Sequence, residues 1–232
     1  MSTATRELTT TETTDRIEAA LATCTPDKLR QMGMIQRTRT LAKAMSTMRT
    51  HFRGEVLEDV KSLVDTPLGF LTDRKDGGKP PYTDDVIRDC VIEAMLRGAE
   101  PVGNEFNVIA GRCYLTKQFF ERALRTTPGF SELRLIEGVP TTAQNVGGAL
   151  VPYRASWRMN GVPDSLVCDQ TKDGDSRIAV RVNSQMGVDA ILGKAKRKML
   201  ARIYARVTGS EWVDDEHEEI VVDAVVDTPE VG

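Results

Sequence analysis

The residues best suited to chemistry in this sequence are the basic side chains of one stretch near the C-terminus. Six of the 13 residues from 194 to 206 are lysine or arginine, and Asp189 is the only acidic residue between positions 188 and 207. Like charges repel one another on a helix, so we expect an anionic partner such as a phosphate backbone to offset them. The alternatives are a solvated helix face or pairing with acidic residues of the same chain. The six residues are Lys194, Lys196, Arg197, Lys198, Arg202 and Arg206.

A second basic set lies in segments that alternate between apolar and polar residues. Arg154 and Arg158 fall on one face of an expected strand, and Arg177 and Arg181 are expected to share a face of another. Such a charged floor suits a groove that follows a nucleic-acid backbone, although an ordinary polar sheet face is the alternative. Arg112, Lys117, Arg122 and Arg125 are weaker candidates.

Aromatic residues near these cations are candidates for stacking on bases, which contributes roughly 1–3 kcal/mol per base. Tyr114, Tyr153 and Trp157 are the three considered. Tyr153 and Trp157 fall on the apolar face of their strand, where core packing is the better expectation.

The distribution of charge supports an anionic partner. The net charge of the 232 residues is −3, but residues 211–232 hold nine acidic residues and no Lys or Arg. Without that segment, 31 basic residues stand against 25 acidic ones. A basic body with an acidic tail is typical of nucleic-acid-binding proteins, although a solvated tail is also common.

Enzyme chemistry has less support, and we expect no catalytic residue, metal or cofactor. Asp164, Asp169, Asp173 and Asp175 could suggest a metal-dependent nuclease. They lie around expected turns, however, where aspartate is favoured by the backbone geometry. No phosphate-binding GxxxxGK[ST] motif occurs, and neither His51 nor His217 has an evident nucleophile or metal partner.

The spacing of the cysteines and the hydropathy of the sequence indicate the cellular compartment in which we expect the protein. Cys24, Cys90, Cys113 and Cys168 are scattered and form no zinc-binding pattern. No run of 18 apolar residues and no secretory signal is present. We therefore expect a reduced protein of the cytoplasm, which would be the bacterial host cytoplasm if the chain is phage-encoded, with no membrane partner.

The pattern of elements predicts an α+β fold, with an antiparallel β-hairpin and a three-stranded meander packed against helices. Residues 1–25 are expected to be flexible, at most weakly helical, because they are rich in threonine. Helices are expected over 26–50, 54–66, 83–97, 116–127 and 188–207, and a hairpin over 105–115. A short strand is expected over 133–136.

The meander is predicted from alternation and turn residues. Its three strands are expected over 151–159, 165–169 and 178–182, and Asn160-Gly161 is a strong type I′ turn signal between the first two. Residues 26–210 are thus interpreted as one domain. Within this domain, the helical residues 26–66 could form a subunit interface, and residues 83–210 form the core. The methionines from Met32 to Met48 are suited to such an interface. The disordered acidic C-terminal tail covers 211–232.

Two segments resemble those of a known family. Glu93 to Arg125, EAMLRGAEPVGNEFNVIAGRCYLTKQFFERALR, resembles the core of phage RecT-like single-strand annealing proteins. Ala190 to Gly209, AILGKAKRKMLARIYARVTG, resembles the basic helix of that family, which follows a β-meander. The shared order of helix, hairpin, helix, meander and basic helix covers roughly residues 83–210, and it could belong to a distant branch of the superfamily that includes Redβ.

The resemblance implies a phage recombinase that binds single-stranded DNA and anneals complementary strands without ATP. It also implies homo-oligomeric rings or helical filaments with a continuous basic groove, in which the strand and the annealed duplex are held. The cations of residues 194–206 match the basic helix by position. The acidic tail could contact an exonuclease or a single-strand-binding protein, or it could screen the groove. The competing hypotheses are a non-annealing nucleic-acid-binding regulatory protein, a metal-dependent nuclease and a structural oligomer.

Overall fold

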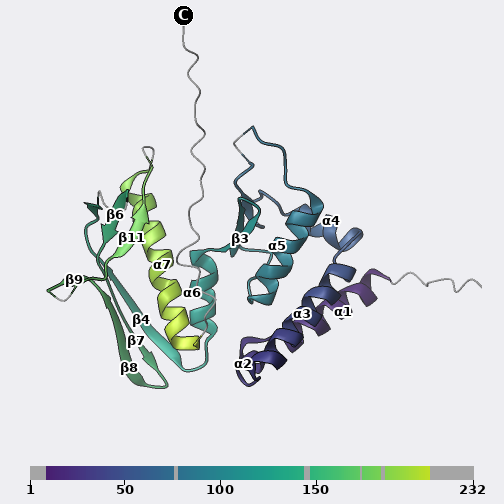
Figure 1. Cartoon of the computed structure of the whole chain (residues 1–232), viewed down its shortest axis with the longest axis horizontal. Helices are drawn as coiled ribbons and strands as arrows, with labels where there is room; N and C mark the ends of the chain where they lie inside the picture. Colours follow the sequence, from purple (N-terminus) through teal and green to yellow (C-terminus); the bar gives the residue numbers. More distant parts are fainter. Residues whose placement is uncertain (1–8, 76–77, 144–146, 173, 184–185, 210–232) are drawn as a thin grey trace, which may run out of the picture.

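The computed structural model describes residues 9–75, 78–143, 147–172, 174–183 and 186–209. The helices of residues 10–96 lie on one side of the molecule and the strands of residues 130–181 lie on the other, with the helices of residues 117–126 and 188–208 between them (Figure 1). The α+β prediction is therefore confirmed. The acidic segment 211–232 lies outside the described residues.

The first described helix corrects, for residues 10–23, the expectation of a flexible segment over residues 1–25. Helix α1 (Thr10–Thr23) begins at a capping box, in which the Thr9 hydroxyl accepts from the Glu12 amide and the Glu12 carboxylate accepts from the Thr9 amide. Ile17 is buried where α1 packs against α3 (Met34–His51). The sequence did not indicate a stable helix here because threonine has only a modest helix propensity. The capping box and the packing of α1 outweigh that propensity.

The expected helix over 26–50 is two helices. Helix α2 (Pro26–Arg30) ends after one turn, and α3 (Met34–His51) begins at Gly33, whose extended backbone breaks the helical path. Helix α4 (Glu55–Lys61) is shorter than predicted and is followed by β1 (Leu71–Thr72), a strand that the sequence pattern did not indicate.

The predicted hairpin is confirmed and lies beside α5 (Asp84–Leu96). Strands β2 (Phe106–Ile109) and β3 (Arg112–Leu115) pair antiparallel through the turn Ala110-Gly111, where both residues have positive φ. β1 pairs parallel with β2. Alternation buries Phe106 and Val108 and turns Asn107 and Tyr114 toward the opposite face.

Two three-stranded sheets share one extended stretch of chain that is interrupted at Pro152. Its parts β6 (Gly148–Val151) and β7 (Tyr153–Met159) are flanked by β5 (Thr141–Ala143) and β4 (Phe130–Glu137) on one side. On the other side lie β11 (Ile178–Arg181) beside β6 and β8 (Val162–Cys168) beside β7. A small hairpin of β9 (Gln170–Thr171) and β10 (Gly174–Asp175) separates β8 from β11.

These sheets confirm one part of the predicted meander and correct another. Asn160 and Gly161 both have positive φ in the turn between β7 and β8, as predicted. The strand expected third, β11, pairs with β6 and not with β8. The third strand beside β7 is instead β4, which is longer than predicted. Local alternation marked each strand but carried no information on its partner.

Helices α6 (Lys117–Thr126) and α7 (Val188–Thr208) close the core between the sheets and the N-terminal helices. Tyr153 and Trp157 are 1% and 2% exposed, so their predicted core position is confirmed. All four cysteines are buried with free thiols. Within the described ranges, no helix has the length and apolar character needed to cross a membrane.

Candidate nucleic-acid interface

The six cations of α7 point in three directions and do not form one surface. Lys196 pairs with Glu121 of α6 at 2.7 Å. Toward the sheet, the Lys198 ammonium donates to the Ala179 carbonyl at 3.1 Å, and Arg202 and Arg206 contact Cys168 and Asp164 of β8. Lys194 and Arg197 face the β2–β3 hairpin. Helical periodicity explains the split, because both sides of α7 are packed.

The arginines of the sheet are placed apart from this hairpin. Arg154 and Arg158 are exposed on the outer face of β7, where they pair with Asp169 at 2.9 Å and Glu132 at 3.2 Å. Arg177 precedes β11 and pairs with Asp175 at 2.7 Å, and Arg181 ends that strand. The predicted charged floor is therefore largely neutralised by neighbouring carboxylates.

A groove of about 460 Å³ brings three of the predicted cations together. The outward face of the β2–β3 hairpin lines it with Asn107, Ile109 and Tyr114. The first turn of α6 forms one wall, and α7 forms another, where the small residues Ala190 and Gly193 leave room for a ligand. The cations that line it are Lys117, Lys194 and Arg197. Arg112 is exposed on the same outward face of the hairpin, next to Ile109 in register.

The chemistry of this groove favours an anion joined to a flat polar group. No aspartate or glutamate among the described residues lines it, and the first turn of α6 contains no acidic residue either. The amide groups at a helix N-terminus favour negative charge. Tyr114 supplies a ring, and the Oδ1 atoms of Asn104 and Asn107 are buried without a hydrogen-bond partner among the described residues. Phosphate, ring and amide contacts can all be met by one nucleotide strand.

Asn104 and Asn107 are candidate residues that our sequence reasoning missed. The signal was present for Asn107, because it alternates with the buried Phe106 and Val108 and so had to face away from the core. Asn104 has positive φ in the turn that precedes β2, which asparagine tolerates better than most residues. Its carbonyl accepts from the Thr116 hydroxyl at 2.6 Å, so the turn is joined to the start of α6.

Arg122, a weaker candidate, has a structural role. Its guanidinium donates to both carboxylate oxygens of Glu105, which is 5% exposed, and to the Gly98 carbonyl at 2.7 Å. The hydrogen bond with Glu105 raises the pKa of Arg122.

The described aspartates considered for a nuclease site are each bound to an arginine. Hydrogen bonds from Arg206, Arg154 and Arg177 lower the pKa values of Asp164, Asp169 and Asp175, respectively. Asp173 lies outside the described residues. In the described part of the chain, no three His, Cys, Asp or Glu side chains are grouped as metal ligands.

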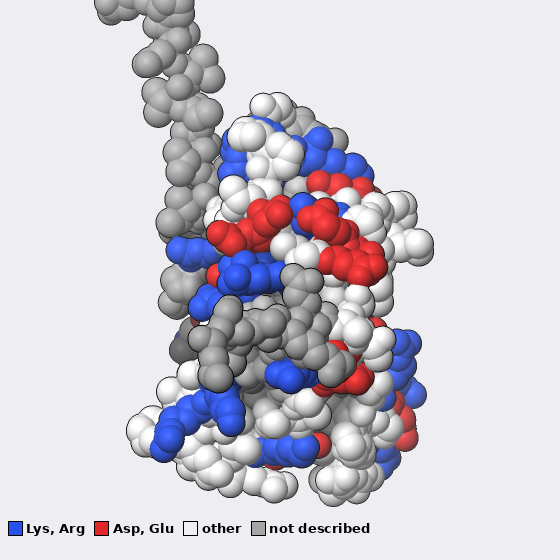
Figure 2. All heavy atoms as spheres, turned by 90° about the vertical axis from the view of Figure 1, so that its right-hand side faces the viewer, with Lys and Arg blue, Asp and Glu red and all other residues white. Residues whose placement is uncertain are grey.

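The face formed by the N-terminal helices, seen in Figure 2, carries acidic and basic side chains next to one another. Pairs such as Arg49–Asp89 and Lys61–Asp84, with N–O distances of 2.9 and 2.8 Å, account for part of this mixture. A mixed surface of this kind attracts a polyanion less than the groove between the hairpin, α6 and α7 does.

Comparison with models of known protein families, with curated proteins and with solved structures finds no match to this chain.

Proposed function

We propose that this protein binds single-stranded DNA in the groove between the β2–β3 hairpin, α6 and α7. The observation that carries the proposal is the composition of the groove wall. Its described residues combine Lys117, Lys194 and Arg197 with the Tyr114 ring and include no acidic side chain. The cations neutralise phosphates, and the ring stacks on a base.

The position of α7 supports a single strand over a duplex read in its major groove. A recognition helix has to project one face into the DNA. α7 buries Ile191, Ala195, Met199, Leu200 and Ile203 among the other elements, and its remaining cations contact α6 and the sheet. It is therefore packed as a wall of the groove, where an extended strand can lie along it.

We further propose that the bound strand is annealed to its complement without ATP, as the resemblance to RecT-like proteins implies. The order α5, β2–β3 hairpin, α6, sheet and α7 agrees with the order of elements in that resemblance. The chemistry is electrostatic, with phosphates neutralised and the strand held extended, and it takes place in the cytoplasm.

Assembly into a homo-oligomer is part of the same proposal. Met32, Met45 and Met48 pack inward, which leaves Met34 as the exposed methionine of the expected interface. Met34 and Ile35, at 75% and 67% exposure, form an apolar pair at the start of α3 that a second subunit can cover. Light scattering of the wild type and of Met34→Asp tests this point, with a smaller particle expected for the variant.

The test compares two double variants that remove the same charge. Lys117→Gln/Lys194→Gln alters the groove, and Arg154→Gln/Arg158→Gln alters the outer face of the sheet. We expect the groove variant to lose at least tenfold in affinity for a single-stranded oligonucleotide. Its plot of log affinity against log salt should become less steep by about 1.4 for two lost phosphate contacts. The sheet variant should bind nearly as the wild type does.

Annealing is followed with two complementary oligonucleotides without ATP, in parallel reactions with and without Mg²⁺. Faster pairing with the wild type and the sheet variant, but not with the groove variant, supports the proposal. Equal losses of annealing in the groove variant and the sheet variant would mean that the groove is not the DNA-binding site. Binding without faster pairing favours the regulatory alternative, and strands shortened only with Mg²⁺ favour a nuclease.

A further inference from the structure

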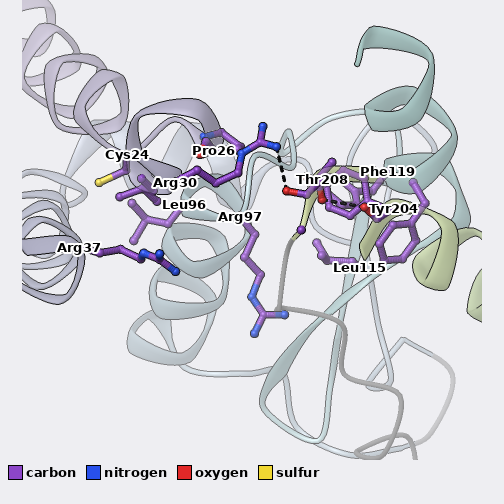
Figure 3. Close-up of a pocket in the computed structure, with 13 residues that line it drawn as sticks. Cys24, Pro26, Arg30, Arg37, Leu96, Arg97, Leu115, Phe119, Tyr204 and Thr208 are labelled. Atoms are coloured by element: carbon purple, nitrogen blue, oxygen red, sulfur yellow. Dashed lines mark hydrogen bonds between the residues drawn. The ribbon is translucent and has the colours of Figure 1, made fainter. Parts of the chain in front are cut away.

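A second pocket lies where the N-terminal helices meet the C-terminal end of α7 (Figure 3). Its floor is apolar, with Leu96, Leu115 and three aromatic rings. Phe119 lies 5.1 Å from Phe120 and 5.7 Å from Tyr204, measured between ring centroids. The proposed DNA groove lies at the other end of α7, around Gly193 and Lys194, and the two cavities share Leu115 in their linings.

Three guanidinium groups line one side of the pocket. Figure 3 shows Arg30, Arg37 and Arg97 on the side of the N-terminal helices and α5, with Phe119 and Tyr204 on the opposite side of the pocket. Among the described residues, the lining contains no aspartate or glutamate. Arg30 donates to the Thr208 carbonyl at 2.8 Å and pairs with Asp27, and Arg97 pairs with Glu93.

Arg37 is the exception among the three. Its side chain is half-buried with a buried Nε, and it makes no hydrogen bond or ion pair with any described residue. A partly buried charge without a partner lowers the stability of the fold. A carboxylate that accepts hydrogen bonds from the planar guanidinium of Arg37 would compensate for that loss. An anionic group therefore fits the space in front of Arg37.

The chain itself carries a suitable group next to the pocket. Helix α7 ends at Thr208, and Gly209 turns the chain out of the helix with φ of 64°; both residues line the pocket. Six of the ten residues 210–219 are acidic, and none is lysine or arginine. At about 3.3 Å per extended residue, residues 211–216 lie within roughly 25 Å of Gly209. A short tether gives such a segment an effective concentration in the millimolar range.

We propose that the acidic segment 211–219 binds in this arginine pocket of its own chain. Its carboxylates pair with Arg37 and with the outward edges of Arg30 and Arg97. The pocket is thus a site for an acidic peptide, and the peptide that binds there is segment 211–219 of the same chain. Since none of these arginines lines the DNA groove, the proposal stands independently of the proposed function.

The full-length protein provides its own probe. The chain has two tryptophans, and Trp157 is 2% exposed, so acrylamide quenching of fluorescence reports on Trp212 within the acidic segment. We expect Trp212 to be at least twofold less quenched in the wild type than in a free peptide of residues 209–219. The protection should be lost in Arg37→Gln and at 1 M salt.

The matched control is Arg39→Gln, which removes the same charge from the same helix at an exposed position outside the pocket. It should leave quenching unchanged. The reciprocal variant Asp214→Asn/Asp215→Asn/Glu216→Gln leaves the described fold untouched and should reproduce Arg37→Gln. Circular dichroism establishes that each variant is folded.

Hydrogen exchange of residues 211–219 is the second measurement. Slower exchange in the wild type than in Arg37→Gln supports the proposal. Two results overturn the proposal. In the first, Trp212 of the wild type is quenched to the same extent as in the free peptide, and residues 211–219 exchange at the same rate. In the second, Arg37→Gln and Arg39→Gln behave identically in both measurements.

Discussion

At the scale of single residues, whether a lysine or arginine can bind an anionic ligand depends on whether it is already paired with a carboxylate of the protein. Arg206 donates two hydrogen bonds to Asp164, at 3.0 and 2.8 Å, and its guanidinium carbon lies 5.9 Å from the centre of the Trp157 ring. A phosphate would have to displace the carboxylate before it could bind there. Lys117 and Lys194, by contrast, line a groove to which the described part of the chain contributes no acidic side chain.

The ion pair of Arg206 predicts the titration of Asp164. The hydrogen bond from Arg206 lowers the pKa of Asp164, so the carboxylate stays charged until the pH falls through that lowered value. Any stability from the pair is therefore present at neutral pH and is lost in acid. We expect Arg206→Gln to raise the pKa of Asp164 in a ¹³C NMR titration.

Arg154→Gln is the control for that titration. It should move the pKa of Asp169, its own partner, and leave Asp164 as it is in the wild type. An Asp164 carboxyl that titrates identically with and without Arg206 would contradict the assigned pair.

Glu105 shows that one carboxylate can join several elements. It accepts from Arg122 of α6 and from the backbone amide of Glu100 at 2.9 Å, so it fixes the turn before β2 against α6. Glu105→Ala leaves the Arg122 guanidinium without its buried partner. We expect urea denaturation to show a loss of about 3–5 kcal/mol in the free energy of unfolding.

Glu121→Ala provides the comparison, because Glu121 pairs with Lys196 at the surface of the same helix. Its loss should cost less than about 1 kcal/mol, as is typical of exposed pairs. Similar losses in both variants would mean that Glu105 has no special role.

At the scale of elements, two glycines predict opposite effects of an added methyl group. Gly193 lies inside α7 with open space where a Cβ atom would lie, so Gly193→Ala should raise the free energy of unfolding by about 0.5–1 kcal/mol. At Gly148 of β6, a Cβ atom would lie 2.1 Å from the Val180 carbonyl oxygen of β11. Gly148→Ala should lower stability by about 1–3 kcal/mol. Thermal unfolding measures both, and equal shifts would be inconsistent with this packing.

Elements whose signals are local were predictable from the sequence. The hairpin β2–β3 and the turn Asn160-Gly161 follow from alternation and from residues that tolerate positive φ. The pairing of β11 with β6 was not predictable, because it depends on the β9–β10 hairpin that carries the chain past the end of β8. Helix α1 carried a readable signal in Thr9 and Glu12, which its threonine content obscured.

The candidate site was predictable in part for the same reason. Sequence periodicity identified α7 as basic, and it named Lys117, Lys194 and Arg197 among the candidates. It could not separate the cations that line the groove from those paired with Glu121, Asp164 and Asp169, since those partners lie far away in the sequence.

At the scale of the whole molecule, one hydrophobic core runs from Ile17 of α1 to Ile203 of α7. A continuous core favours cooperative unfolding. We expect the urea transitions followed by helical circular dichroism, which includes α1–α3, and by the fluorescence of buried Trp157 to coincide. Separate midpoints would mean that the N-terminal helices unfold independently of the sheet.

The hydrogen bond from Arg30 to the Thr208 carbonyl joins residues 178 positions apart. During synthesis, helix α2 leaves the ribosome long before the end of α7 exists. At 5–20 residues per second, the wait is roughly 10 to 35 s, whereas a helix forms in about a microsecond. The surface of α2 that later contacts α7 is therefore uncovered on the nascent chain for most of translation. The rate of translation, rather than the rate of helix formation, sets the moment at which the N-terminal helices complete their packing.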